Sequence, residues 1–300
     1  DKQLSVVFYY SRSFHESATI ERLAEHYRSS LEELIEHCLS AEAGGLTPSD
    51  VSWTGLDESG LRQVVEDVGC GSSPHRLAAV YPASALQTGM LIESLRHADS
   101  GVYMTQPVLT LRGQVSIEAL EAALGDVLEA FAVLRSAFSY REGERPYQVV
   151  FKSVSVRVEQ EDWRGLSAEE QRARWERLLA SEKEGVLDLS RAPLMRFRWV
   201  RRTEEESELI WTHHHALLDG WSLPRVLEAL FSAYAARVQG QPLRLPYSEP
   251  YASYVGWLHR QDVSAAEAFW REYLSGVESG TGVPFARRTR KTGAEPGVRY

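Results

Sequence analysis

Cysteine is scarce in this chain, with only Cys38 and Cys70 among 300 residues. Two cysteines provide neither a disulfide framework nor the ligand spacing of a structural zinc site, so we expect a reducing compartment. Long apolar runs are missing too, and the longest falls well short of the roughly 18 residues that a membrane span requires. We also expect no signal peptide. These absences favour a cytoplasmic protein without a membrane partner.

Positive charge is not in excess either. The chain has 33 basic and 42 acidic residues, a net charge of −9, and residues 1–70 alone carry 5 basic against 13 acidic ones. A nucleic-acid-binding protein would show a basic field, so we expect no nucleic-acid partner. Only the stretch 286–300 is locally basic, and we interpret it as a solvated loop or linker.

The first 70 residues do not make a convincing domain of their own. A β-prone run covers 4–10, an amphipathic helix follows Ser17 as far as Cys38, and a short helix spans roughly 57–68. A Gly/Ser/Pro cluster at Gly69–Pro74 is the best linker in the sequence. We therefore predict that 1–68 is the tail of a preceding domain and that 69–77 is a linker.

From residue 78 the pattern becomes α/β. The spacing of apolar residues predicts helices that begin near Ser84, Ser116, Ser167 and Ser222, the third of them with a capping box. Alternation predicts strands between them, which are 108–112, 147–151, 154–158, 194–200 and 209–213. Strands separated by helices and hairpins indicate a mixed β-sheet covered by helices.

The strongest chemical signal is a run of three histidines, His213 to His215, followed by Asp219 and Gly220. An imidazole has an ordinary pKa of about 6.5, which suits proton transfer near neutrality. Neighbouring residues of a strand point to opposite faces, so three consecutive histidines cannot converge on one metal ion, and we expect no metal. We expect Asp219 to fix the loop, and Gly220 to adopt a backbone conformation that other residues resist.

Several short motifs, in order along the chain, resemble those of condensation domains of nonribosomal peptide synthetases. His214-His215-Ala216-Leu217-Leu218-Asp219-Gly220 matches the HHxxxDG signature of that family. The opening motif is similar at Ser84–Met90, and three further elements are similar at Leu134–Phe138, Leu187–Leu194 and Tyr251–Trp257. The resemblance implies a chloramphenicol acetyltransferase-like α/β lobe, the first of two, over residues 78–285. It also implies that 286–300 begin the crossover to a missing second lobe.

The resemblance also implies roles for single residues. His215 would be the catalytic histidine that deprotonates or orients the acceptor amine as it attacks the donor thioester. His214 would support it, and Gly220 would lie where the backbone approaches the reacting groups. Asp219 would be structural and paired with Arg135, whose guanidinium suits bidentate binding of a carboxylate. For His213, which lies outside the motif, we favour packing within the strand.

The implied activity is peptide-bond formation between carrier-bound thioesters. Donor and acceptor carrier domains would be the partners and would bring phosphopantetheine, so no cofactor would be bound directly. Tyr10-Ser11-Arg12, His37-Cys38 and Gly44–Asp50 resemble the end of an epimerisation domain. An upstream epimerisation domain would imply a donor that ends in a D-configured residue.

Two other functions stay open on the sequence. A related acyltransferase that uses an acyl-CoA donor would share the histidine motif, although it would not be expected to carry the epimerisation-like tail. A non-catalytic module that recruits carrier domains would keep the fold, although such modules usually show a degraded histidine motif.

Overall fold

The computed structural model describes residues 4–40, 43, 46–51, 54–71, 73, 76–97, 100–185, 187–245 and 247–277. The chain divides into two compact units, residues 1–258 and 259–300. The predicted crossover over 286–300 lies outside the described residues. Within the described ranges, no helix is both long and apolar enough to cross a bilayer.

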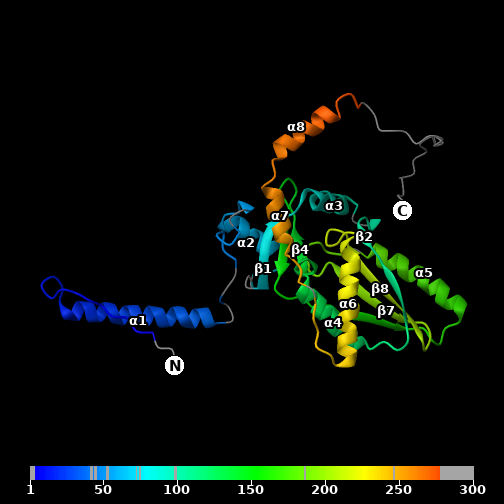
Figure 1. The fold of residues 1–300 in the computed structure, drawn as a ribbon, viewed down its shortest axis with the longest axis horizontal. Coiled ribbons are helices and arrows are strands. Elements are labelled where there is room, and N and C mark those ends of the chain that lie inside the picture. The colour runs from blue at the N-terminus through cyan, green and yellow to red at the C-terminus, as the bar shows by residue number, and fades with distance from the viewer. Residues whose placement is uncertain are drawn as a thin grey trace. The chain divides into compact units, whose positions relative to one another are not determined.

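The larger unit contains two sheets with helices around them (Figure 1). The strands are β1 (Leu77–Pro82), β2 (Met104–Thr105), β3 (Val108–Arg112), β4 (Ser136–Ser139), β5 (Tyr147–Phe151), β6 (Val158–Asp162), β7 (Met195–Arg201) and β8 (Glu206–His214). The helices are α1 (Ser17–Leu39), α2 (Glu58–Asp67), α3 (Ala85–Arg96), α4 (Ile117–Ala130), α5 (Ala168–Glu184), α6 (Ser222–Gln239) and α7 (Tyr251–His259), whose last residue belongs to the second unit.

One sheet has the strand order β2-β8-β7-β6, with β3 also paired to β8. All its pairs are antiparallel except β6 with β7, so the sheet is mixed as predicted. Helices α4 and α6 pack against each other and cover one face, where their apolar residues join Phe197, Leu209 and Trp211 in the main core. On the other face, Glu182 of α5 forms ion pairs with Arg196 and Arg198 of β7.

The second sheet is antiparallel with the order β1-β5-β4. Its two faces bury different partners, because side chains of a strand alternate. Val149 and Phe151 of β5 pack with Leu61 and Val65 of α2, whereas Val150 packs with Val255 of α7. The segment predicted to end a preceding domain thus contributes α2 to this core. The domain limits themselves stay predictions.

Two sequence expectations about strands are wrong. Residues 4–10 form no strand in the described part of the chain, and α1 buries none of its side chains. The strand expected at 154–158 lies four residues later, as β6, while Val154 and Val156 pack as loop residues against the core.

The predicted helix starts are present. The side chains of Ser84 and Ser167 each accept a hydrogen bond from the backbone N–H three residues later, and Gln87 and Glu170 return the interaction. These two capping boxes satisfy backbone donors that a helix N-terminus would otherwise leave free. Gly240 ends α6 in the left-handed conformation, with a φ of 64° that favours glycine.

The remaining helix, α8 (Val263–Tyr273), lies in the second unit. Asp262 caps it by accepting a hydrogen bond from the N–H of Ala265. None of its side chains is buried.

Candidate active site

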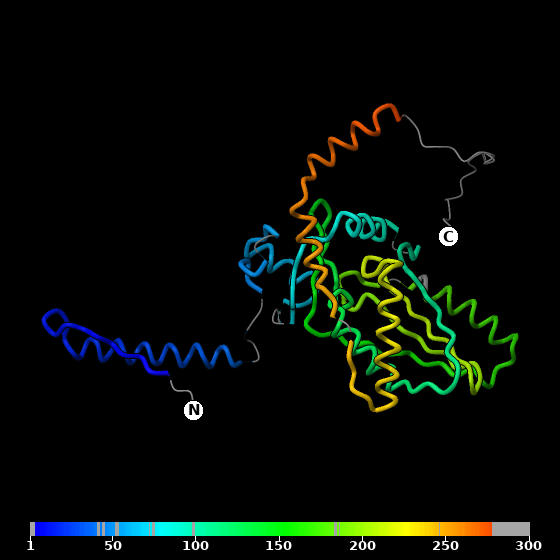
Figure 2. The backbone as a smooth tube through the Cα atoms, in the orientation of Figure 1, coloured from blue at the N-terminus to red at the C-terminus, as the bar shows by residue number. Residues whose placement is uncertain are grey.

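The histidine motif occupies the end of β8 and the loop that leads into α6, and the chain can be followed through it in Figure 2. His213 and His214 are the last residues of β8, opposite Thr105 and Met104 of β2. His215 is the first residue after the strand, and its backbone N–H donates to the carbonyl of Tyr103 at 2.8 Å. The loop is therefore held at the sheet edge by β2 and the residue before it.

His215 has a defined tautomer. Its Nδ1 lies 2.6 Å from the carbonyl oxygen of Leu218. A carbonyl oxygen only accepts hydrogen bonds, so Nδ1 carries a proton, and in the neutral ring Nε2 is the basic nitrogen. The side chain is half-buried, whereas the other two histidines of the run are buried. A neutral imidazole with a basic Nε2 is the form that general-base chemistry requires.

His214 is held from both sides of its ring. Nδ1 accepts a hydrogen bond from the backbone N–H of Ala216 at 3.2 Å, so Nε2 carries the proton and donates to Oγ of Ser94 at 2.9 Å. Burial lowers the pKa of His214 to about 4, and the nearby imidazole of His215 acts in the same direction. His214 is thus neutral near pH 7. These contacts suit the supporting role predicted for it.

His213 points to the opposite face of β8 and is 1% exposed. Its ring lies 4.9 Å from that of Trp211, and its Nδ1 has no hydrogen-bond partner among the described residues. Burial lowers the pKa of His213 to about 4. The residue packs within the core, which is the role that the sequence favoured.

The predicted ion pair between Arg135 and Asp219 is not formed between these two described side chains. The guanidinium of Arg135 donates instead to the carbonyls of Phe151 (2.9 Å), Glu129 (2.8 Å) and Leu128. Burial is the main cause of a lowered pKa of Arg135. The physical reason is position, because Arg135 follows the C-terminal end of α4, where unpaired carbonyls attract a cation.

Asp219 is exposed and stabilises the start of α6. Its Oδ1 accepts a hydrogen bond from the N–H of Ser222 at 2.8 Å, and hydrogen bonds from Ser222 lower the pKa of the carboxyl. The expectation that Gly220 needs an unusual backbone is wrong, because its φ is not positive. A Cβ at Gly220 would meet no described atom within 4 Å, so the space above it is open.

Sequence reasoning missed the residues that hold this loop. The Nε2 of Gln87 donates to the carbonyl of Ala216 at 3.0 Å and to Oε1 of Gln148 at 2.8 Å, and Nε2 of Gln148 donates to Oγ of Ser136 at 2.7 Å. Gln87 lies in a motif that we noted, but Ser94 and Gln148 lie in none. A glutamine inside the apolar strand Tyr147–Phe151 was a signal for Gln148, whereas the sequence contains no comparable signal for Ser94.

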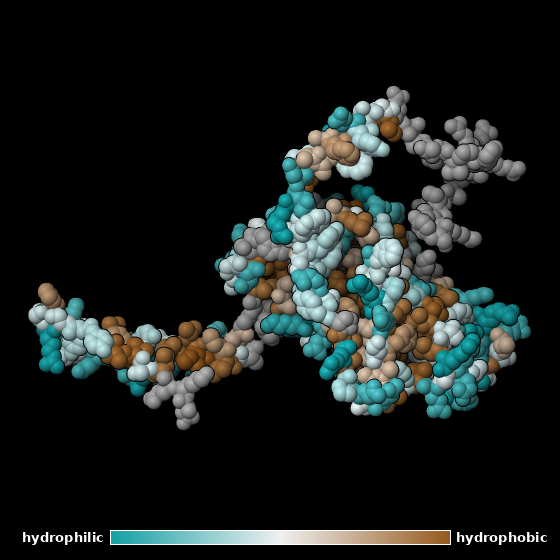
Figure 3. Space-filling view, viewed as in Figure 1, coloured by the Kyte–Doolittle hydropathy of each residue, from teal (hydrophilic) through white to brown (hydrophobic). Residues whose placement is uncertain are grey.

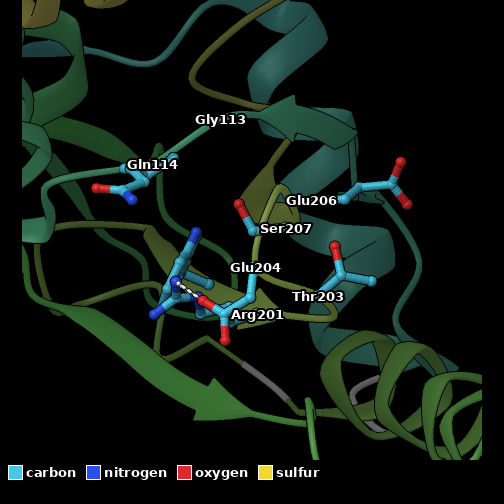
Figure 4. A pocket seen from close by; sticks show the side chains of 9 residues that line it. Gly113, Gln114, Arg201, Thr203, Glu204, Glu206 and Ser207 are labelled. Carbon is cyan, nitrogen blue, oxygen red and sulfur yellow. Dashed lines mark hydrogen bonds and ion pairs between the residues drawn. The ribbon is translucent and has the colours of Figure 1, made fainter.

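The described cavities lie elsewhere. One of about 110 Å³ is lined by residues of β7, of β8, of the turn between them and of the segment after β3. Arg201 and Glu204 of this lining form an ion pair at 2.8 Å (Figure 4). A wider hollow next to it shares Val115, Trp199 and Arg201. Neither is lined by a residue of the histidine loop. Among the described residues, no group of three or more His, Cys, Asp or Glu could hold a metal ion.

Comparisons with known proteins agree on one family. The model of the condensation domain matches residues 78–296. One of the linear gramicidin synthase proteins of Brevibacillus parabrevis is 37% identical over 292 residues, which are 97% of this chain and 4% of that protein. Bacitracin synthase 1 of Bacillus licheniformis is 32% identical over 286 residues, 95% of this chain and 5% of that protein.

Solved structures show the same fold. The first condensation domain of the calcium-dependent antibiotic synthetase aligns with a TM-score of 0.60 at 18% identity, over 69% of this chain and 50% of that one. The X-domain from teicoplanin biosynthesis, solved in complex with OxyB, aligns with a TM-score of 0.58 at 28% identity, over 69% of this chain and 46% of that one. The chain thus spans about half the length of these structures and a small fraction of the two synthases.

Proposed function

Because the chain belongs to the condensation-domain family of nonribosomal peptide synthetases, we propose that it forms peptide bonds between two carrier-bound thioesters, with His215 as its catalytic residue. The observation that carries this proposal is the hydrogen bond from Nδ1 of His215 to the Leu218 carbonyl. In the neutral ring, that bond leaves Nε2 as the basic nitrogen, in a half-buried position on the loop between β8 and α6.

The proposed reaction needs one proton acceptor and no redox chemistry. The acceptor amine attacks the donor thioester carbonyl, so a C–N bond forms, the C–S bond breaks, and the donor carrier leaves as a thiolate that takes up the proton lost by the amine. Nε2 of His215 takes the proton that the amine loses, or orients the amine through the same atom. The open space above Gly220 gives the substrates access to the backbone there.

Carrier domains are the proposed partners, and their phosphopantetheine arms are substrates rather than a bound cofactor. The two synthases that the chain resembles are far longer than this chain, which suits a domain that acts between others. We propose further that a second lobe completes the site, because the aligned condensation domain is about twice as long as the part matched here.

A donor with a D-configured terminal residue is also proposed. It rests on the epimerisation-like motifs before residue 51. The likeness to the linear gramicidin synthase protein covers 97% of this chain and therefore extends well beyond the part that the family model matches. The test is a comparison of donors that differ only in the configuration of their last residue.

A carrier- or enzyme-recruiting module without turnover is the second candidate. One observation favours it, which is the 28% identity to an X-domain that was solved in complex with another protein. The intact HHxxxDG motif favours catalysis instead.

An acyl-CoA donor, the remaining alternative, is tested by replacing the loaded donor carrier with the corresponding acyl-CoA.

The deciding experiment is single-turnover amide formation in the synthetase polypeptide that carries this sequence, with both carriers preloaded. His215→Ala should slow the reaction by about 10²–10⁴-fold, the usual contribution of a general base. His97→Ala is the matched control, because His97 is a histidine outside the motif whose side chain is 61% exposed. A wild-type protein without turnover would support the recruiting module, and an unchanged His215→Ala rate would exclude His215 as the base.

A further inference from the structure

The residue after His215 is fixed at both of its backbone polar groups. The N–H of Ala216 donates to Nδ1 of His214 at 3.2 Å, and its carbonyl accepts from Nε2 of Gln87 at 3.0 Å. Ala216 is itself buried. The two peptide groups that flank Ala216 are thus each held by a buried side chain, and neither can rotate without breaking one of these bonds.

Both bonds lead to one helix, α3. Gln87 contacts the loop directly, and Ser94 contacts it through His214, whose Nε2 donates to the Ser94 hydroxyl at 2.9 Å. The two residues are seven positions apart, which places them two turns apart on one face of a helix. Leu91 on the same face is fully buried in the core that also contains Leu217 and Leu218 of the loop.

The amide of Gln87 can be oriented in only one way. Its Oε1 accepts hydrogen bonds from the N–H and the hydroxyl of Ser84, at 3.0 and 3.1 Å. Nε2 is therefore the atom that faces the carbonyl of Ala216 and Oε1 of Gln148, and both of these are acceptors. Because the capping box of α3 sets this orientation, the helix start and the loop are coupled.

We propose that α3 is the positioning element of the site, and that Ser94 and Gln87 are positioning residues that aim Nε2 of His215 at the acceptor amine. The proposal rests on the proposed function for its kinetic consequence. Ser94 keeps the protonated Nε2 of His214 satisfied, which leaves Nδ1 free to hold Ala216. Without the Ser94 hydroxyl, His214 has a buried donor with no acceptor and gains by rotating or changing tautomer, which releases Ala216 and lets His215 drift.

Ser94→Ala is the sharpest variant, because it removes one half-buried hydroxyl and leaves no cavity larger than an oxygen atom. Ser94→Thr keeps the hydroxyl and serves as the rescue. Thr88→Ala is the matched control, since Thr88 lies on the same helix, is also half-buried and has a side chain with no hydrogen bond among the described residues. Gln87→Leu follows as a second variant, with its folding checked by thermal unfolding.

In the single-turnover assay, Ser94→Ala should lower the rate about 10- to 100-fold at saturating carriers, because small misplacements of a reacting group are costly. The half-saturating carrier concentrations should stay at the wild-type values, the melting temperature should fall only by the few degrees that one lost buried hydrogen bond costs, and Ser94→Thr should recover most of the rate. An unchanged rate in Ser94→Ala would overturn the proposal. So would a rate loss that Ser94→Thr does not recover and that accompanies a large fall of the melting temperature.

The imidazole nitrogens give a readout that does not depend on turnover. In protein labelled with ¹⁵N-histidine, wild-type His214 should show a protonated Nε2 and an unprotonated Nδ1, and His215 the reverse. Ser94→Ala should change the His214 signals, and Thr88→Ala should not. If the wild type shows these tautomers without any condensation, the proposed function fails and the positioning contacts stand. If His214 is unchanged in Ser94→Ala, the positioning role is wrong whatever the activity.

Discussion

Arg135 shows how a correct motif can suggest a wrong partner. The resemblance to condensation domains implied a pair with the carboxylate of Asp219, and a guanidinium suits bidentate binding of a carboxylate. In the structure its guanidinium binds the last carbonyls of α4 and one carbonyl of β5. Asp219, being exposed, bonds to Ser222 in its own loop. Sequence spacing alone does not give the distance between Arg135 and the end of α4.

The two residues should therefore contribute to stability independently. Arg135→Ala should lower the free energy of unfolding by about 1–3 kcal/mol, because buried carbonyls lose a charged donor. Asp219→Ala should cost about 0.5–1.5 kcal/mol, as for one lost hydrogen bond. In urea unfolding of both single variants and the double variant, the two costs should add to within about 0.5 kcal/mol. A coupling energy clearly larger than that would show that Arg135 and Asp219 interact as an ion pair after all.

Among the elements, helices that begin with a serine cap were predicted, and so were the strands β3 and β5, whereas β1, β2 and β4 were not. Ser84 and Ser167 begin their helices with capping boxes, which depend only on residues close in sequence. The strand β4 has only four residues and takes its conformation from pairing with β5, and β1 begins where the predicted linker ends, at a place for which no strand was predicted. Local sequence carries the caps, whereas strand pairing depends on residues far away in the chain.

Helices α1 and α2 behave differently, although both precede the part that the family model matches. Leu61 of α2 is 4% exposed in the cluster that contains Phe151, whereas Leu34 of α1 is 57% exposed. Figure 3 shows hydrophobic side chains on the surface of α1. An amphipathic pattern predicted both helices, but it did not tell which of them is covered.

Matched leucine substitutions test this difference. Leu61→Ala should lower the free energy of unfolding by about 2–5 kcal/mol, because it opens a cavity in a packed core. Leu34→Ala should change it by less than about 0.5 kcal/mol, as is usual for an exposed position. Thermal or urea unfolding of the two variants decides. Equal costs would mean that α1 is buried as α2 is, and that the 1–68 tail packs as a unit.

On the scale of the whole molecule, the site lies where the two sheets come together. Gln148 belongs to β5 of one sheet and His214 to β8 of the other. From α3, Gln87 contacts Gln148 and Ser94 contacts His214. The sequence predicted which loop carries the chemistry. It could not predict the network that holds the loop, because the contacts of α3 with β5 and with the histidine motif join residues 61 to 129 positions apart.

The exposed aromatic side chains of α8 give the last prediction. Phe269, Trp270 and Tyr273 are 57%, 54% and 69% exposed, and their rings contact one another. Contiguous exposed apolar surface promotes association. We therefore expect residues 1–300 to self-associate between about 1 and 100 μM, a range typical of weak interfaces, as measured by sedimentation velocity.

Changing Trp270 to Glu should weaken this association, because a charge would have to be buried without a partner. Ser264→Glu adds the same charge at an exposed polar position of α8 and should leave the association unchanged. If both variants weaken it equally, net charge rather than the aromatic cluster controls the behaviour. A chain that stays monomeric across the range would show that this cluster is too small to drive association.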